Sequence, residues 1–159
     1  MYKRSSFEPS QIINNYYSVL KKITAVSDRI GRDPRTKNLI VVTKTYDEES
    51  ILPLLDIGHS NFGENRVQEA GDKWSRLFTS YPDTKLHLIG HLQTNKTKEA
   101  TKLFDVFHTL DREKLAKEFI KQGDLIKSKK FFIQVNTGRE ETKSGIYLEH
   151  LDGFIKYCK

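Results

Sequence analysis

The sequence has little that would link it to a membrane, an oxidising compartment or a cysteine-bound metal. Its one cysteine, Cys158, cannot form an internal disulfide and has no cysteine partner at a metal site. The N-terminus lacks the apolar segment of a secretory signal peptide, and no apolar run approaches the roughly 18 residues that a membrane span requires. We therefore expect a cytoplasmic protein with no membrane partner.

Nucleotide-binding and nucleic-acid-binding signatures are also lacking. Neither a Gly-x-Gly-x-x-Gly nor a Walker sequence follows any predicted strand. The net charge is +6, but lysines and arginines are interspersed with acids along the predicted helices, as in residues 111–118. No basic stripe rich in aromatic residues is visible, so we expect no nucleic-acid partner. A basic nucleic-acid module is the last-ranked alternative, and it would predict strongly salt-dependent binding.

The sequence does contain a regular alternation of strand-like and helix-like segments. A helix is predicted first, at about 9–30, because Pro9 suits a first helical turn and apolar residues then recur every three or four positions. Apolar strand-like runs follow at 39–43, 59–63, 86–90, 106–109 and 131–135. The helix-like segments between and after them lie at about 48–56, 66–78, 96–104, 112–122 and 148–157.

Short connections between alternating strands and helices favour parallel strands with right-handed crossovers. The 159 residues are expected to form a single domain, residues 1–159. Two α/β folds compete, an open doubly wound sheet and a (β/α)₈ barrel. The lack of a nucleotide-binding motif counts mildly against the doubly wound sheet.

Lys44 lies at the carboxyl end of an apolar stretch, residues 39–45, which contains the predicted strand 39–43. With a period of two, Ile40, Val42 and Lys44 share one face of this strand, which we expect to be buried on both faces. An ammonium that loses hydration there would favour its neutral amine, the form that attacks an aldehyde. The plainer alternative is a surface lysine whose methylene groups cover apolar neighbours.

Further polar residues lie at the ends of the other predicted strands. Asn65, the segment 90–96 and the loop 136–145 follow strands, and His108 and Asp111 flank the end of the fourth strand. In a parallel α/β fold, all of these positions lie at the edge of the sheet where binding sites form.

Several of these residues have simpler explanations. Asn65, with Gln68 three residues later, could serve as a helix cap, as a ligand-binding residue, or as both. Lys143 lies in a loop with Glu140 and Glu141 and could form only a solvated ion pair. His91 has no histidine or cysteine partner at ligand spacing, so no metal site is predicted.

Four motifs together resemble one known family. They are Val41–Thr45, Phe62–Glu69, His87–Lys96 and Gln134–Gly145. In this order they look like the YggS/PROSC family of pyridoxal phosphate homeostasis proteins. The resemblance extends from the N-terminal helix to the last residue.

The resemblance implies a (β/α)₈ barrel of the TIM-barrel type, similar to the N-terminal domain of alanine racemase. Here only about the first five βα units and the N-terminal helix would be present. It also implies pyridoxal 5′-phosphate (PLP) as cofactor, held as an aldimine on Lys44 with Asn65 beside it, and no established catalytic activity. Enzymes that lack PLP are the implied recipients, and we expect a monomer. The alternatives are a PLP-dependent amino-acid racemase or decarboxylase and a truncated fragment that does not bind.

The chain departs from the family in length. A (β/α)₈ barrel takes roughly 200 residues or more, and the family's later segments, which by resemblance carry most phosphate contacts, have no counterpart here. We therefore expect a truncated product whose sheet edges are unpaired and whose inner strand faces are partly open to water. Weak cofactor affinity and low stability would follow.

Overall fold

The computed structural model describes residues 2, 6–33 and 39–159. In order, its helices and strands are α1 (Pro9–Arg29), β1 (Val41–Val42), α2 (Glu48–Asp56), β2 (Asn61–Glu64), α3 (Val67–Ser80), β3 (Lys85–Leu88), α4 (Thr97–Leu103), β4 (Val106–Leu110), α5 (Glu113–Ile120), β5 (Lys130–Ile133) and α6 (Leu151–Cys158). Short 3₁₀ turns occupy Thr94–Lys96, Gly123–Ile126 and Leu148–His150. None of the helices in these ranges is long and apolar enough to cross a membrane.

The strands form one parallel sheet in the order β1-β2-β3-β4-β5, so each strand pairs with the next one along the chain. This order is the one that consecutive right-handed βα units produce in a barrel wall. The predicted α/β class and the five βα units are confirmed. α1 ends at Arg29, one residue before the end of the predicted range.

The first strand is shorter and more open than predicted. Its ladder with β2 joins only Val41 to Phe62 and Val42 to Gly63, and one further hydrogen bond runs from Thr43 N to Gly63 O at 3.0 Å. Val42 is 45% exposed. The expectation that the 39–45 strand is buried on both faces is therefore wrong, because only one face of this sheet is covered.

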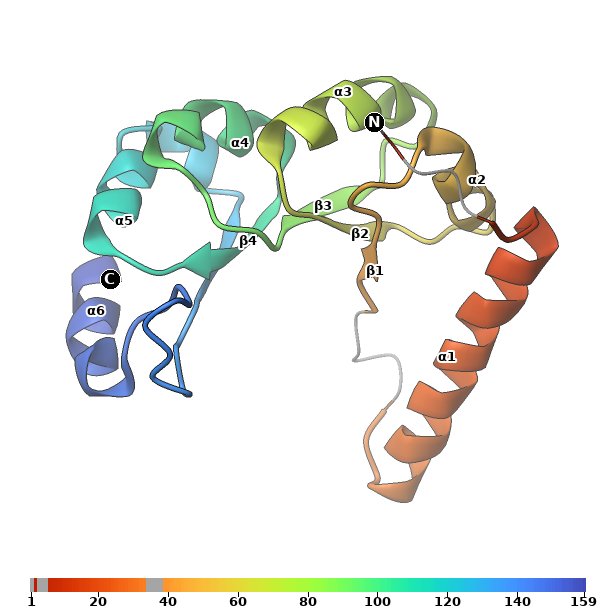
Figure 1. Ribbon diagram of the computed structural model, residues 1–159, viewed down its shortest axis with the longest axis horizontal. Coiled ribbons are helices and arrows are strands. Elements are labelled where there is room, and N and C mark those ends of the chain that lie inside the picture. Colours follow the sequence, from red (N-terminus) through yellow and green to blue (C-terminus); the bar gives the residue numbers. More distant parts are fainter. Residues whose placement is uncertain (1, 3–5, 34–38) are drawn as a thin grey trace.

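Helices α2 to α5 cover one face of the sheet, and the strands lie on the inside of the resulting arch (Figure 1). The core lies between these two layers. It is built from strand residues Phe62, Leu86, Leu88 and Phe107 and from helix residues such as Trp74, all of them almost fully buried. Burial of this apolar surface supplies most of the stabilisation expected for such a layer.

A cluster of phenylalanines closes the core at the β4 and β5 side. The ring centroid of Phe107 lies 4.7 Å from that of Phe119 in α5 and 5.2 Å from that of Phe131 in β5. Phe104, at the end of α4, lies 6.2 Å away on another side. These distances are typical of favourable aromatic pairs, so α4, α5 and β5 are fixed through one side chain.

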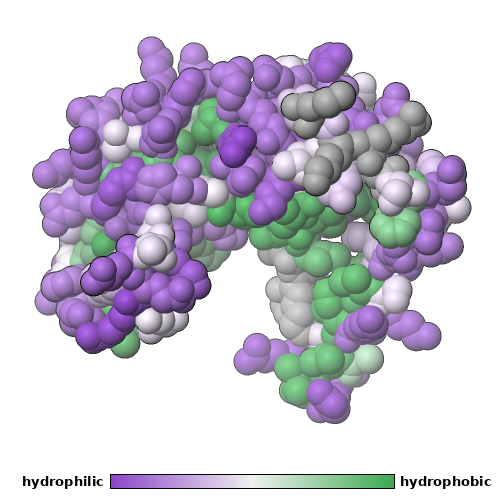
Figure 2. Space-filling view, viewed as in Figure 1, coloured by the Kyte–Doolittle hydropathy of each residue, from purple (hydrophilic) through white to green (hydrophobic). Residues whose placement is uncertain are grey.

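The other face of the sheet is open. Figure 2 shows apolar surface in the hollow beneath the arch, on the side away from α2 to α5. Phe132, on this face of β5, is 52% exposed and stacks on His108. This agrees with the expectation that the inner strand faces are partly open to water.

α1 uses only part of its apolar stripe. Ile12 and Tyr16, in its first half, are partly buried against the core, and this half packs on α2. Val19, Val26 and Ile30 are exposed, because the second half projects away from the sheet (Figure 1). The stripe predicted a helix correctly, but it did not predict that the apolar residues of the second half would be exposed.

We expect Phe107→Ala to lower the free energy of unfolding by about 3–5 kcal/mol, because it removes a ring that packs against three others. Phe132→Ala is the matched control, and we expect it to cost less than about 1 kcal/mol since its ring is exposed. Urea denaturation of both variants measures the difference. Equal losses would contradict the assignment of the core to the helix-covered face.

Candidate functional site

Lys44 and Asn65 occupy neighbouring positions at the carboxyl edge of the sheet. The register pairs Val42 with Gly63, and Lys44 and Asn65 each come two positions after these paired residues. A side chain at Gly63 would meet Ile40 and Val42, so β1 and β2 approach closely on the inner face. The edge therefore brings together the two residues that the sequence predicts for cofactor binding.

Lys44 lies in a turn and is exposed. Tyr46 N donates to Thr43 O at 3.2 Å, and Thr45 has a φ of 69°. A positive φ is unusual for a β-branched residue, so the backbone directly after Lys44 is strained. We predicted from the sequence that the Lys44 ammonium would lose hydration. The described residues do not shield it from water, because the side chain is exposed.

Asn65 does not cap the following helix. The residue before α3 is Arg66, and it makes no side-chain cap bond. The Oδ1 atom of Asn65 is buried and has no hydrogen-bond partner among the described residues. Gly90 packs directly on the Asn65 backbone, where a Cβ would lie 2.2 Å from Asn65 O. A buried acceptor without a partner is costly, and a ligand that donates to it would remove this cost.

A network of buried charges that the sequence analysis missed lies on the helix side of Lys44. Lys73 Nζ lies 2.9 Å from Glu64 Oε1, and both side chains are almost fully buried. Trp74 Nε1 donates to the same Glu64 oxygen at 3.0 Å. Alternation could have revealed this network, because Glu64 shares a strand face with Phe62, and an acid on a core face needs a partner.

The residues predicted after β3 and β4 also meet at this edge. His91 Nδ1 lies 3.5 Å from Asp111 Oδ2 and 3.4 Å from Ser144 Oγ. Arg112 donates to Leu92 O at 2.7 Å. Among the residues that the structure describes, no group of three potential ligands could hold a metal ion.

The loop after β5 is organised around Asn136. Its side-chain amide donates to Glu140 O at 2.8 Å and to Lys143 O at 3.2 Å. Gly145, with a φ of 127°, lets the loop return against the Asn136 backbone. Lys143 and Glu140 form the exposed ion pair that the sequence analysis gave as the simpler explanation. A polar hollow of about 350 Å³ lies between this loop and the ends of β3 and β4.

A chain of hydrogen bonds crosses the inner face below the edge. His87 Nδ1 lies 2.9 Å from His108 Nε2, and His87 Nε2 lies 3.2 Å from Asn61 Oδ1. β4 runs to Leu110, so His108 lies inside the strand and only Asp111 follows its end. Burial, and then the neighbouring His108, lower the pKa of His87 to about 4, and burial lowers the pKa of His108. Both rings are neutral at pH 7.

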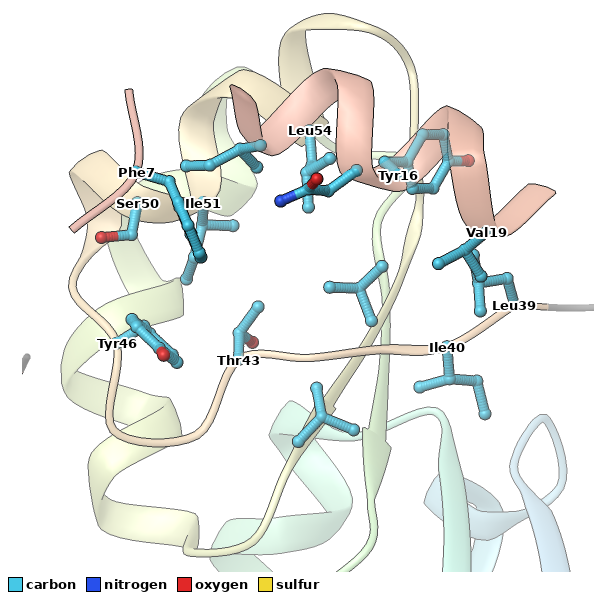
Figure 3. Close-up of a pocket in the computed structure, with 14 residues that line it drawn as sticks. Phe7, Tyr16, Val19, Leu39, Ile40, Thr43, Tyr46, Ser50, Ile51 and Leu54 are labelled. Carbon is cyan, nitrogen blue, oxygen red and sulfur yellow. The ribbon is translucent and has the colours of Figure 1, made fainter. Parts of the chain in front are cut away.

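A mainly apolar pocket lies beside this edge but on another side of β1. Figure 3 shows side chains of α1, of α2 and of the segment around β1 that surround it, including Tyr16, Ile40 and Leu54, and its volume is about 330 Å³. Thr43 and Tyr46 line it, whereas Lys44 does not. Its lining is mainly apolar and, among the described residues, includes no cationic side chain, so it does not suit an anionic ligand such as a phosphate.

The fold and the edge together define an α/β chain of the barrel type, with a lysine at the end of its first strand. No protein-family model matches the chain. Its sequence is 38% identical over 146 residues to the pyridoxal phosphate homeostasis protein of Escherichia coli K12, covering 90% of this chain and 62% of that protein. It is 36% identical over 140 residues to the protein of that name from Vibrio alginolyticus, covering 86% of this chain and 60% of the relative.

Solved structures are also similar to this chain. A protein of unknown function from Bifidobacterium adolescentis matches with a TM-score of 0.86 and 25% identity, over 99% of this chain and 68% of that one. PipY of Synechococcus elongatus, solved with PLP bound, matches with a TM-score of 0.69 and 31% identity, over 84% of this chain and 62% of PipY. The resemblance to pyridoxal phosphate homeostasis proteins is confirmed. The chain spans less than two thirds of the length of these two curated relatives.

The His87 pair predicts a specific loss of stability in acid. Because the folded state binds a proton more weakly than the unfolded chain, the stabilisation present above pH 6.5 is lost as the pH falls toward 4. Between pH 7 and pH 4.5 we expect the wild type to lose about 1–3 kcal/mol more than His87→Gln, whose side chain cannot titrate. Urea denaturation at several pH values measures this. His150→Gln, at an exposed position, should keep the wild-type profile, and identical profiles for all three proteins would contradict the assignment.

Proposed function

We propose that the chain binds PLP through Lys44 and takes part in PLP homeostasis without turning over a substrate. The observation that carries this proposal is the buried Oδ1 atom of Asn65, which has no partner among the described residues and lies at the same edge of the sheet as Lys44. The relatives are named for PLP homeostasis, and PipY has been solved with PLP bound. Both facts support the same ligand.

The described residues fit this cofactor. Asn65 Oδ1 can accept a hydrogen bond from a donor on the ring, and the close packing of Gly90 on the Asn65 backbone fixes its position. Lys44 is exposed at the same edge, so its amine is accessible to a ligand. His91 after β3 and Asp111 after β4 add polar groups further along the edge.

PLP supplies an aldehyde that a lysine amine can attack and a ring that withdraws electrons. In this chain, Lys44 Nζ is the attacking group, and Asn65 orients the ring beside it. The exposed turn lets water reach Lys44, which suits reversible loading and release more than a protected reaction.

The wider activity belongs to the proposal as well. The relatives are longer than this chain, so delivery of the cofactor to enzymes that lack it, and function as a monomer, are inferred from the family resemblance. We place the chain among binding proteins because its relatives are named for homeostasis and not for a reaction.

Lys44→Ala tests the proposal directly. We expect the wild type incubated with PLP to gain the visible absorption band of a lysine-bound cofactor and, after borohydride reduction, the mass of one cofactor. The variant should lose both, because the attacking amine is gone. Absorbance and intact mass are the measurements.

Lys114→Ala, which removes an exposed lysine of α5, is the matched control and should behave as the wild type. Equal labelling of the wild type and Lys44→Ala would refute the role of Lys44. No labelling of the wild type would refute the binding of PLP by this chain.

Asn65→Ala separates a binding role from a structural one. Because Oδ1 has no partner in the folded chain, we expect its removal to leave the melting temperature unchanged or slightly raised. The dissociation constant for PLP should rise about tenfold, since a ligand would lose a buried acceptor. Thermal melting and PLP titration measure the two effects. A large loss of stability with unchanged PLP affinity would instead show that Asn65 is structural.

A further inference from the structure

The turn that carries Lys44 receives little support from the sheet itself. β1 pairs with β2 over only two residues, and Lys44 makes no part of that ladder. The next residue, Thr45, is held at a φ of 69°, which a β-branched residue adopts only under constraint. Strand pairing reaches only as far as Thr43, whose N–H donates to Gly63 O, so further contacts are needed to hold the turn around Lys44.

Three charged side chains supply that constraint. Lys73 Nζ donates to Thr43 O at 2.8 Å, and Thr43 Oγ1 donates to Glu64 Oε1 at 2.7 Å. On the other side of Lys44, Thr45 N donates to Glu69 Oε1 at 2.5 Å. Each bond has an ionised partner, which makes it stronger than a bond between neutral groups.

The three side chains form one unit, called here the Glu64–Lys73–Glu69 network. Lys73 Nζ lies 2.9 Å from Glu64 and 3.5 Å from Glu69, and the exposed fractions of the side chains are 1% for Lys73, 0% for Glu64 and 15% for Glu69. Tyr2 covers the network from outside, because its ring lies 5.4 Å from Lys73 Nζ and its hydroxyl donates to Glu69 O at 3.1 Å. Buried charges of this kind keep a fixed geometry, since any displacement leaves one of them unpaired.

We propose that the Glu64–Lys73–Glu69 network positions Lys44 for its bond with the cofactor by holding Thr43 and Thr45. This inference rests on the proposed function. The network is packed against Trp74 on the helix side of the sheet, so it acts on Lys44 through the backbone and not through contact with the ligand. Its members are positioning residues.

Glu69 offers the cleanest test, because it is the least buried of the three side chains. Glu69→Ala deletes the acceptor for Thr45 N, whereas Glu69→Gln keeps an oxygen at the same place. For Glu69→Ala we expect amide hydrogen exchange at Thr45 to rise about tenfold or more and PLP affinity to fall by a similar factor. Glu69→Gln should recover most of both values.

A second pair of variants separates positioning from simple loss of stability. Thr43→Val removes the hydroxyl that Glu64 accepts while keeping the shape of the side chain, and we expect it also to weaken PLP binding. Leu115→Ala removes a buried core side chain of α5 that makes no contact with the network. It should lower the melting temperature at least as much as Glu69→Ala without changing exchange at Thr45.

The outcomes distinguish this inference from the function on which it rests. If the wild type is not trapped on Lys44 by borohydride, both fail. If the wild type is trapped but Glu69→Ala keeps normal exchange at Thr45 and normal PLP affinity, positioning by the network is wrong and the proposed function stands. If Leu115→Ala weakens PLP binding as much as Glu69→Ala, the network is merely structural and the inference is overturned.

Discussion

The ion pair between Glu64 of β2 and Lys73 of α3 joins the elements from which the Lys44 edge is built. Removing two charges from water is expensive, and the attraction between them offsets this cost only when their remaining hydrogen-bonding capacity is used. Here Glu64 Oε1 also accepts from Thr43 and Trp74, while Lys73 also donates to Thr43 O. The other oxygen, Glu64 Oε2, is buried and has no hydrogen-bond partner among the described residues, so the cost is only partly offset. The pair fixes α3 and the end of β1 relative to β2, where strand pairing spans only two residues.

The two faces of the sheet serve different purposes. The face beneath α2 to α5 is apolar and aromatic, and its burial holds the layers together (Figure 1). The inner face has His87, His108 and Asn61 in a chain of hydrogen bonds, with Phe132 exposed beside them. These polar side chains form hydrogen bonds with one another. His87 is neutral at pH 7, because its pKa is lowered to about 4. The candidate ligand-binding residues lie instead at the carboxyl edge, where parallel α/β proteins form their binding sites.

Much of the fold could be predicted from local patterns, and the reasons for the failures are physical. Alternating apolar segments predicted the five βα units, and the acidic start at Glu48 together with Gly58 after its end predicted α2 at its observed bounds. The length of β1 and the projecting half of α1 depend on which neighbours are present, which periodicity does not encode. Lys73 looks like an ordinary surface charge of a helix in the sequence, and only its position over Glu64 and Thr43 reveals its role. The sequence likewise cannot show that Asn65 Oδ1 is buried without a partner, because this depends on how the chain packs around Asn65, including Gly90 against its backbone.

We propose that Lys44 and Asn65 bind one PLP molecule at the edge between β1 and β2. A crystal structure of the chain with PLP would show whether they do. We expect continuous density from Lys44 Nζ to the cofactor, with a donor atom of the cofactor within hydrogen-bond distance of Asn65 Oδ1 and the turn at Thr45 unchanged. Cofactor bound in the apolar pocket beside α1 or at the loop 136–145, with Lys44 free and Asn65 Oδ1 still without a partner, would contradict it.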